Sequence, residues 1–298
     1  KNKAKISGIN YQQCLQLFFQ EEFLRKLALS NYSKNFILKG GLFIYTLTNF
    51  ESRATVDVDF LMRGLNGNMD YMDEIITEIL TMPTGNDFLT LKASKTKPIA
   101  LQRKYPGVTA QITGYLKNVR VPFNVDIGIG DVIIPHPETR RIQTQLDGYE
   151  KPTILTYSLE STIAEKFDAI LQRFELTGRM KDFYDIYYLA RTFDFDGLKL
   201  QTAIQETLQN RGTAYEKNSF DRILSLANEE TMQVKWRYFL RTLGDQDIPF
   251  SQIIKGLEEF LKPLWNDFLL EREFLYQWTA KENAWSRIYN DPAALYVK

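Results

Sequence analysis

The spacing of apolar residues changes near residue 156, and this change constrains the fold of the 298-residue chain more than any other feature. Before that point, short segments rich in β-branched residues alternate with turn residues and with helical stretches. After it, apolar residues recur with helical spacing, and no convincing strand is expected. The pattern therefore predicts an α+β domain over residues 1–156, followed by a helical domain over residues 157–298.

The individual elements follow from the same spacing. The expected strands are residues 35–38, 56–62, 89–93, 99–104, 108–116 and 121–129. The expected helices are residues 11–29, 42–48, 68–81, 163–174, 181–191, 198–209, 220–226, 229–240 and 250–270. Turn residues, among them Lys97-Pro98, separate the last four strands, which favours an antiparallel meander. A loop is expected around Pro135, Pro137 and Gly148, and Ser158 is expected to cap the first helix of the second domain.

Composition excludes several classes of protein. The 37 Lys and Arg residues balance 37 Asp and Glu residues, which argues against a surface wholly devoted to nucleic acid but leaves room for a local basic groove. No run approaches the ~20 apolar residues that a membrane helix needs, so no membrane association is expected. One cysteine, Cys14, and one histidine cannot form a zinc–thiolate site, whereas a metal held by carboxylates is compatible with the composition. The single cysteine also fits a cytoplasmic protein.

The strongest candidate for a chemical site lies around two paired aspartates. Lys39, Gly40 and Gly41 precede a predicted helix, where bare backbone N–H groups can approach an anion. Asp57 and Asp59 lie in a predicted strand, where they would point to the same face about 6.6 Å apart. Like carboxylates repel each other unless water or a cation neutralises them, and Mg²⁺ suits such a pair because it prefers oxygen ligands. This combination indicates phosphoryl or nucleotidyl transfer, and a solvated edge strand is the alternative.

A third acid, Asp126, lies in another apolar strand, where a charge is costly unless it is paired or binds a metal. Beside the two aspartates of the earlier strand, it would complete the carboxylate triad that two-metal catalysis requires. The alternatives for Asp126 are a turn cap near Gly128 and an ion pair with Arg120. Asp131 is a further candidate, but its turn-like surroundings favour a structural role.

Charged residues also recur in the predicted helices after residue 156. Lys166 could reach a triphosphate as a point charge, or it could be an ordinary surface lysine paired with Glu165 or with a residue one turn away. Asp182 and Asp185 are three residues apart and so share one helix face. Asp182 also lies in the first helical turn, where the helix dipole favours a carboxylate in any case. By themselves, these residue types favour a structural role.

Five motifs follow one another in a fixed order. They are Leu38-Lys39-Gly40-Gly41, Arg53-x-Thr55-x-Asp57-x-Asp59, Val125-Asp126-Ile127-Gly128, Ser161-x-x-Ala164-Glu165-Lys166 and Arg179-x-Lys181-Asp182-x-Tyr184-Asp185. Together they resemble the AbiEii/AbiGii nucleotidyltransferase toxin family, which includes the MenT toxins. The resemblance implies an α+β fold: a polymerase beta-like nucleotidyltransferase core with a mixed sheet, followed by a helical C-terminal domain.

The resemblance also assigns roles to individual residues. The catalytic residues that it implies are Asp57, Asp59, Asp126, Lys166 and Asp182, the first three as metal ligands. The nucleotide-binding residues that it implies are Lys39, Gly40, Gly41, Arg53 and Lys166. The late acidic residue is Asp182 or its near neighbour Asp185. One departure matters: relatives often carry a small hydroxyl residue after the glycines, whereas this chain has Leu42, so backbone contacts to phosphate would have to suffice.

The leading prediction is a Mg²⁺-dependent nucleotidyltransferase that uses a nucleoside triphosphate and acts as the toxin of a bacterial toxin–antitoxin pair. By resemblance, its acceptor is RNA, at the 3′ end of tRNA, so that translation and growth stop, and its partner is a cognate antitoxin. Two alternatives stay open: transfer to a protein or a small molecule, and a non-catalytic nucleotide-binding regulator. A basic patch could contact an RNA backbone or be a solvated sheet edge; it consists of Lys92, Lys95, Lys97, Arg103 and Lys104.

Overall fold

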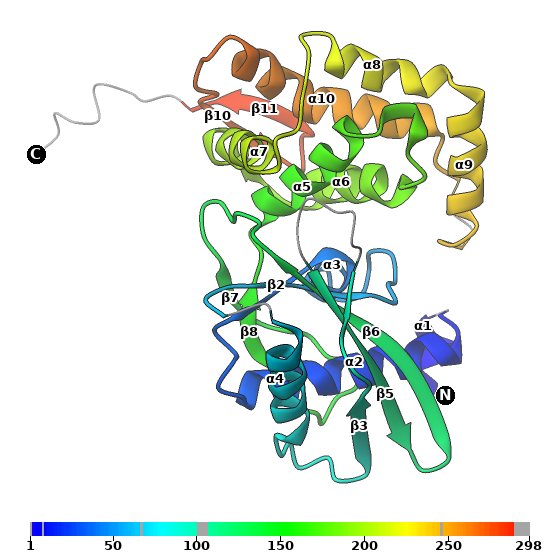
Figure 1. Ribbon diagram of the computed structural model, residues 1–298. Helices are drawn as coiled ribbons and strands as arrows, with labels where there is room; N and C mark the ends of the chain where they lie inside the picture. Colours follow the sequence, from blue (N-terminus) through cyan, green and yellow to red (C-terminus); the bar gives the residue numbers. More distant parts are fainter. Residues whose placement is uncertain (1, 8, 66–67, 100–106, 245–246, 289–298) are drawn as a thin grey trace, which may run out of the picture. The chain divides into compact units, whose positions relative to one another are not determined.

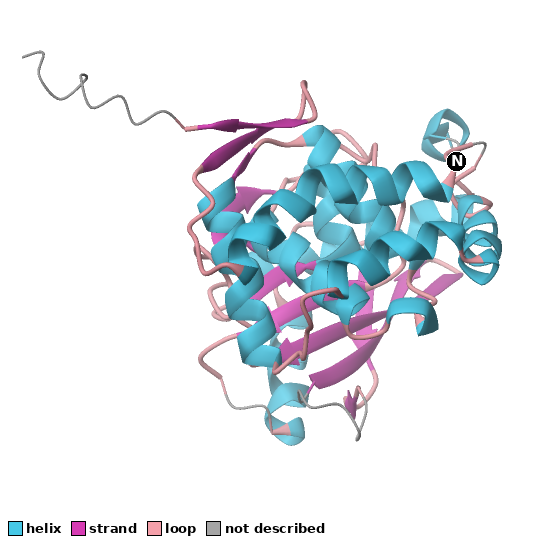
Figure 2. Cartoon of the chain, turned by 90° about the horizontal axis from the view of Figure 1, so that it is seen from above, coloured by secondary structure: helices cyan, strands magenta, loops and turns pink. Residues whose placement is uncertain are grey.

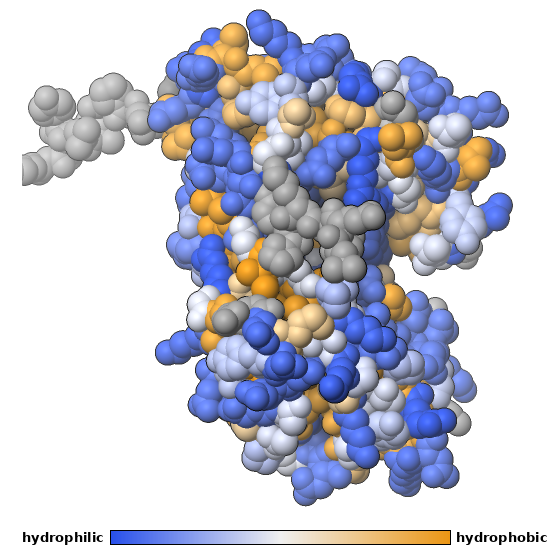
Figure 3. All heavy atoms as spheres, in the orientation of Figure 1, coloured by the Kyte–Doolittle hydropathy of each residue, from blue (hydrophilic) through white to orange (hydrophobic). Residues whose placement is uncertain are grey.

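The computed structural model describes residues 2–7, 9–65, 68–99, 107–244 and 247–288 (Figure 1). The chain divides into two compact units, unit 1 with residues 1–158 and unit 2 with residues 159–298. The surface visible in Figure 3 is mostly hydrophilic, with scattered apolar residues. Within the described part of the chain, no helix is long and apolar enough to cross a membrane.

Unit 1 is built on an eight-stranded sheet. Its strands are β1 (Phe36–Lys39), β2 (Val58–Met62), β3 (Leu89–Ala93), β4 (Lys97–Pro98), β5 (Gly107–Leu116), β6 (Val119–Ile129), β7 (Glu138–Arg141) and β8 (Thr153–Thr156). Seven of them follow the order β3-β5-β6-β2-β1-β8-β7, and β4 pairs with β5. β1 runs parallel to β8 and β2 runs parallel to β6, whereas the other pairs are antiparallel. The sheet is therefore mixed, and β3, β5 and β6 form the expected antiparallel arrangement.

Four helices of unit 1 lie within the described residues: α1 (Asn2–Ser7), α2 (Tyr11–Leu29), α3 (Gly40–Leu47) and α4 (Met69–Thr81). α2 packs against β6, β8 and α4, while α3 packs against β1 and β2. Phe23 of α2 contacts Phe60 of β2, which also contacts Phe36 of β1. Phe19 of α2 lies so close to Gly114 of β5 that any side chain at residue 114 would collide with its ring. α2 therefore covers one face of the sheet over β5, β6 and β2.

The structure confirms most predicted elements of unit 1, and the exceptions have local causes. The helix predicted at residues 11–29 has those bounds as α2. The strand predicted at residues 56–62 begins only at Val58. Lys97 and Pro98, expected in a turn, pair with β5 as β4, and the strand predicted at residues 99–104 falls almost wholly outside the described residues. β7 lies where a loop was expected, because four residues are too few for an alternation to stand out.

Unit 2 is dominated by helices. They are α5 (Leu159–Leu171), α6 (Met180–Thr192), α7 (Gly197–Arg211), α8 (Ser219–Ser225), α9 (Glu230–Leu240) and α10 (Phe250–Leu269), with short 3-10 helices at Phe174–Leu176 and Leu226–Asn228. α5 packs against α6 and α7, and α10 packs against α6, α7 and α8. Phe167 of α5 meets Trp265 of α10 edge to face, with ring centroids 5.5 Å apart. These helices confirm the helical spacing read from the sequence.

A small sheet in unit 2 corrects the expectation that no strand follows residue 156. β9 (Phe195–Asp196), β10 (Tyr276–Thr279) and β11 (Ala284–Arg287) pair antiparallel in the order β11-β10-β9 and lie beside the helices (Figure 2). Trp278 and Trp285 lie opposite each other on β10 and β11, and Nε1 of Trp278 donates a 2.6 Å hydrogen bond to the carbonyl of Ala190. Strands of two to four residues carry too little alternation to be recognised in sequence.

Candidate active site

The chain passes from β1 into α3 through two glycines. α3 begins at Gly40 itself and not at Leu42 as predicted, so both glycines belong to the first helical turn. Gly40 has a φ of +71°, a left-handed conformation that residues with a side chain avoid. A Cβ atom at Gly40 would collide with Oδ2 of Asp59 on β2. The bare backbone of Gly40 therefore lets the Asp59 carboxylate approach the start of α3.

The second glycine is enclosed by residues of the segment before β2. A Cβ atom at Gly41 would lie 2.7 Å from Oγ1 of Thr55 and 3.4 Å from a guanidinium nitrogen of Arg53. Oγ1 of Thr55 also accepts a hydrogen bond from the N–H of Asp57, at 3.4 Å. Arg53 was predicted to bind nucleotide, whereas Thr55 had no assigned role; its place between Arg53 and Asp57 in the motif was the available signal. The side chain of Leu42 is fully buried, so Thr55 brings to this turn the hydroxyl group that residue 42 lacks.

Asp59 and Asp126 lie opposite each other on neighbouring parallel strands. The β2–β6 register pairs them directly, and side chains in register on adjacent strands point to the same face. Both residues are partly exposed, and Oδ1 of Asp126 accepts a 2.7 Å hydrogen bond from Oγ1 of Thr109 on β5. Asp126 lies within β6, so the turn-cap alternative is wrong. Arg120 lies six residues earlier in the same strand, roughly 20 Å away, so the ion-pair alternative is wrong as well.

Asp57 lies outside the strand in which it was predicted, because β2 begins at Val58. Side chains of α2 bind the backbone just before that strand. The carbonyl of Val56 accepts hydrogen bonds from Nε2 of Gln16 at 2.7 Å and from Nε2 of Gln20 at 2.8 Å. These contacts take a backbone acceptor away from the sheet ladder, which explains why the alternating pattern overstated the length of the strand.

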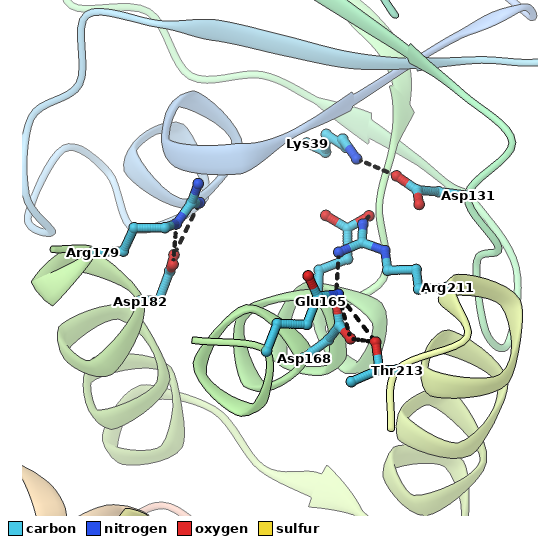
Figure 4. Close-up of polar contacts among 9 residues, drawn as sticks. Lys39, Asp131, Glu165, Asp168, Arg179, Asp182, Arg211 and Thr213 are labelled. Atoms are coloured by element: carbon cyan, nitrogen blue, oxygen red, sulfur yellow. Dashed lines mark hydrogen bonds and ion pairs between the residues drawn. The ribbon is translucent and has the colours of Figure 1, made fainter. Parts of the chain in front are cut away.

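Lys39, the last residue of β1, lies in register with Asp59. Its Nζ lies 2.8 Å from Oδ2 of Asp131, as Figure 4 shows, and 5.1 Å from the ring centroid of Tyr157. This ion pair fits the structural role that the turn-like position of Asp131 favours, and that role stays a prediction. These contacts hold the Lys39 ammonium at the end of β1, and its contact with a nucleotide stays a prediction.

The carboxylates of unit 1 suit a divalent cation that keeps part of its own hydration shell. Among the described residues, no three Asp, Glu, His or Cys side chains form a group that could hold a metal ion by themselves. Mg²⁺ does not need such a group, because it usually binds through one or two carboxylates and completes its octahedral shell with water and phosphate oxygens. Asp59 and Asp126 in register offer two carboxylates, with Asp57 two residues before Asp59. These residues fit Mg²⁺ that arrives with a triphosphate, and they do not fit a preformed metal cage.

In unit 2, the predicted residues Lys166, Asp182 and Asp185 form one buried ion cluster. Nζ of Lys166 lies 2.6 Å from Oδ2 of Asp185 and 3.4 Å from Oδ1 of Asp182. Nε of Arg179 lies 2.5 Å from the other oxygen of Asp182 (Figure 4). Both aspartate side chains are 1% exposed and that of Lys166 is 10% exposed, so its interpretation as a surface lysine is wrong. The shared helix face of Asp182 and Asp185 is confirmed, and two cations balance the two carboxylates.

A second buried cluster of unit 2 escaped the sequence analysis. Oδ2 of Asp168 on α5 lies 2.9 Å from Nη1 of Arg211 at the end of α7, and the Asp168 carboxylate also binds Thr213 (Figure 4). Gln172 donates a hydrogen bond to the same carboxylate. Nη2 of Arg211 lies 2.9 Å from Glu165 as well. The cluster fastens α5 to the end of α7. Because 43 residues separate Asp168 from Arg211, no local pattern could have predicted their contact.

Solved structures with the same architecture define the class of fold. The structure of MenT4, a nucleotidyltransferase toxin from Mycobacterium tuberculosis H37Rv, matches with a TM-score of 0.53 at 14% identity, over 91% of this chain and 98% of MenT4. A protein from H. pylori that was inferred to be a nucleotidyltransferase matches with a TM-score of 0.50 at 10% identity, over 89% of this chain and 100% of its own. The chain thus shares the α+β fold of these two proteins, which is consistent with the predicted polymerase beta-like core.

The family follows from the sequence itself. Residues 22–263 match the family described as nucleotidyl transferase AbiEii toxin, of type IV toxin–antitoxin systems. The chain belongs to this AbiEii nucleotidyltransferase toxin family, which confirms the predicted enzyme class and the toxin–antitoxin context. No curated protein sequence matches the chain. Membership implies a nucleoside triphosphate substrate and an antitoxin partner.

Proposed function

We propose that this enzyme uses Mg²⁺ to transfer a nucleotide from a nucleoside triphosphate to the 3′ hydroxyl of tRNA, and that the modified tRNA no longer supports translation. The observation that carries the proposal is the register of Asp59 and Asp126, with the bare backbone of Gly40 against the Asp59 carboxylate. This arrangement offers oxygen ligands directly beside the start of a helix, where phosphate oxygens bind well. The tRNA acceptor rests on the resemblance to the family.

The carboxylates of unit 1 would perform the chemistry. Asp57, Asp59 and Asp126 would hold Mg²⁺, which when bound supplies positive charge to the triphosphate and polarises the reacting phosphate. Asp126 would accept the proton of the RNA hydroxyl, directly or through water. The 3′ oxygen forms a bond to the α-phosphorus, the bond from that phosphorus to the bridging oxygen breaks, and pyrophosphate leaves.

The first turn of α3 would bind the triphosphate. The N–H groups of Gly40 and Gly41 point to the N-terminal end of the helix, where the dipole favours negative charge. Arg53 adds a guanidinium and Thr55 adds a hydroxyl donor beside Gly41. Thr55 would thus supply the hydroxyl group that residue 42 lacks.

Lys166 and Asp182 of unit 2 keep the roles that the resemblance implies, as proposals. Within the described part of the chain, Nζ of Lys166 binds two carboxylates, so one of its three N–H donors remains for a phosphate oxygen. Asp182 and Asp185 would hold this ammonium in one orientation. Of the two, Asp185 makes the shorter contact and is the stronger candidate for orienting Lys166.

The test is to incubate each labelled nucleoside triphosphate with the enzyme and with either total RNA or total protein. We expect label in small RNA, and mass analysis of tRNA 3′ ends should show one or more added nucleotides. The variants Asp57→Ala and Asp59→Ala should transfer no label while they keep the circular dichroism spectrum of the parent. Transfer by both variants would overturn the metal assignment. Label in protein, or nucleotide binding without any transfer, would favour the two alternatives.

A further inference from the structure

One face of the unit 1 sheet carries a row of polar residues through the candidate active site. Strand pairing places Lys97 of β4 opposite Thr109 of β5, which in turn lies opposite Asp126 of β6. Asp126 pairs with Asp59 of β2, and Asp59 pairs with Lys39 of β1. Residues that lie directly opposite each other on neighbouring strands share a face. The candidate carboxylates therefore lie in the middle of a row that spans five strands and has a lysine at each end.

The same face continues away from the carboxylates along β5 and β6, two long antiparallel strands (Figure 1). Every second residue belongs to it. The next rows are Gln111–Asn124, Lys92–Thr113–Pro122 and Thr90–Tyr115–Arg120. From Asp126 to Arg120, six residues of strand cover about 20 Å. Beyond Asp126 the rows contain no acidic residue, but they contain the two cations Lys92 and Arg120.

This face is open, while the opposite face is covered by α2. Lys92, Gln111, Arg120 and Asn124 are all exposed, although each lies within a strand. Most residues that alternate with them are buried, and Phe19 of α2 packs on β5 from that side. The buried ones are Leu91, Ala110, Ile112, Val121, Phe123 and Val125. A solvated sheet face needs only mixed polar residues, whereas the charged residues of this face beyond Asp126 are all cations, and the face leads to the candidate active site.

An aromatic ring stands at the far end of the face. Tyr115 is partly exposed, and Nζ of Lys92 lies 5.6 Å from the centroid of its ring. Arg120 lies directly opposite Tyr115 on β6. Aromatic side chains on an open sheet, with cations beside them, are a common platform for stacking single-stranded bases. Side-chain amides such as those of Gln111 and Asn124 can both donate to and accept from base edges.

We propose that this face, the β5–β6 track, binds the single-stranded 3′ end of the RNA acceptor and leads its terminal hydroxyl to Asp59 and Asp126. The β5–β6 track is made of Lys92, Gln111, Tyr115, Arg120 and Asn124. The proposal rests on the proposed function and names where its substrate lies. The cations meet the phosphates, Tyr115 stacks a base, and the absence of acids from the track removes repulsion of the RNA backbone. A peptide strand is a poorer fit, because β5 and β6 already pair with each other along their length.

The experiment compares Lys92→Ala/Arg120→Ala with the control Lys217→Ala/Lys255→Ala, which removes two exposed lysines of unit 2. The probe is a 5′-labelled, single-stranded RNA of 12 nucleotides with a free 3′ hydroxyl, and binding is followed by fluorescence anisotropy across a salt series. We expect the track variant to bind RNA about tenfold more weakly, with a salt slope smaller by about 1.4, because two phosphate contacts are lost. The control should stay within twofold of the parent.

Tyr115→Leu keeps the apolar bulk but removes the aromatic ring. We expect this variant to bind RNA about tenfold more weakly at all salt concentrations.

Binding of the triphosphate is the second readout, and both track variants should keep it within twofold. If the parent binds and modifies RNA while the track variants equal the control, the β5–β6 track is wrong and the proposed function stands. If the parent neither binds nor modifies RNA, both proposals fail. If the track variants lose triphosphate binding to the same degree as RNA binding, the track is not a separate acceptor surface and the inference fails.

Discussion

Two groups of aspartates in this enzyme differ in how their charge is balanced. Asp182 and Asp185 of unit 2 are buried, and each lies against a cation. Asp59 and Asp126 of unit 1 are partly exposed and lie in register, and Asp126 is bound by a neutral hydroxyl. Both acids of the first group lie in buried ion pairs, whereas the acids of the second lie side by side on one partly exposed face, next to Lys39 and the start of α3. Burial within ion pairs suits acids that support the fold, whereas two partly exposed acids side by side suit the external cation of the proposed function.

The largest expected effect is on the activity of the unit 1 group. Asp59→Asn should lower nucleotide transfer by about 10⁴-fold, or ~5 kcal/mol of transition-state stabilisation, because a metal ligand is lost. The free energy of unfolding should change by less than about 1 kcal/mol, because Asp59 is partly exposed and Asn has nearly the same shape. Transfer assays and urea denaturation measure the two quantities, with Asp87→Asn at an exposed position of unit 1 as the control. A large loss of stability with full activity would contradict the expected difference between the two groups of aspartates.

The unit 2 group should show the opposite pattern. Asp185→Asn leaves Lys166 buried with a weakened partner, which should cost about 4 kcal/mol of unfolding free energy. The control is Glu259→Gln, which breaks an exposed pair with Lys255 on α10, at 3.8 Å. That change should cost well under ~1 kcal/mol. Equal unfolding free energies for the two variants, measured by urea denaturation, would show that the buried cluster does not support the fold.

Glu21 differs from both groups of aspartates, because its carboxylate is buried and makes no ion pair among the described residues. Glu21 of α2 accepts a 2.7 Å hydrogen bond from the N–H of Gln145, while its Oε2 is buried without a hydrogen-bond partner among the described residues. Burial raises the pKa of Glu21 to about 7, against the lowering effects of Gln145 and Arg25. Between pH 4.5 and 7 the folded state keeps a proton that the unfolded state has released, so stability falls as pH rises through this window.

Glu21→Gln should remove this pH dependence. Relative to the parent, the variant should gain roughly 3 kcal/mol of unfolding free energy above pH 7 and nothing below pH 4.5. Urea denaturation at several pH values gives the difference, and Glu51→Gln at an exposed position is the control. A constant difference between the Glu21→Gln variant and the parent at all pH values would mean that Glu21 titrates normally.

The smallest expected effect isolates the contact between α3 and Asp59. Gly40 and Gly85 have φ values of +71° and +76°, but a Cβ at Gly85 would meet nothing within 4 Å. Both Gly→Ala variants should lose about 1 kcal/mol of stability from backbone strain. Only Gly40→Ala should also displace the Asp59 carboxylate, with a further loss of about 30-fold in transfer, or ~2 kcal/mol. Equal transfer rates in the two variants would show that Gly40 serves only the helix start.

The sequence predicted those parts of the fold that local spacing determines. The 19 residues of α2 carry a long apolar stripe, so their helix was found with its bounds. Local spacing could not predict contacts between segments that are distant in the sequence. Gln16 and Gln20 of α2 donate hydrogen bonds to the backbone just before β2, and Asp57 lies outside the strand that was predicted for it. The strands β9, β10 and β11 were too short to show an alternation.

The candidate site was only partly accessible to the same reasoning. Residue types and spacing singled out Asp57, Asp59 and Asp126, and the resemblance added Lys166 and Asp182. The pairing of Asp59 with Asp126 depends on a register between strands that lie 67 residues apart, which no periodicity contains. The residue types did not single out Thr55, because a neutral hydroxyl group is common in structural positions. Its proposed role rests on its closeness to Gly41, which only the structure shows.

The parallel register of β2 and β6 has a consequence for the cell that makes this toxin. If β2 slipped by one residue, the Asp59 side chain would move to the opposite face of the sheet from Asp126. A chain that is incomplete or wrongly assembled therefore cannot bring its two acids together. Under the proposed function, no nucleotide transfer is expected until synthesis has passed residue 129 and β2 and β6 have paired in this register.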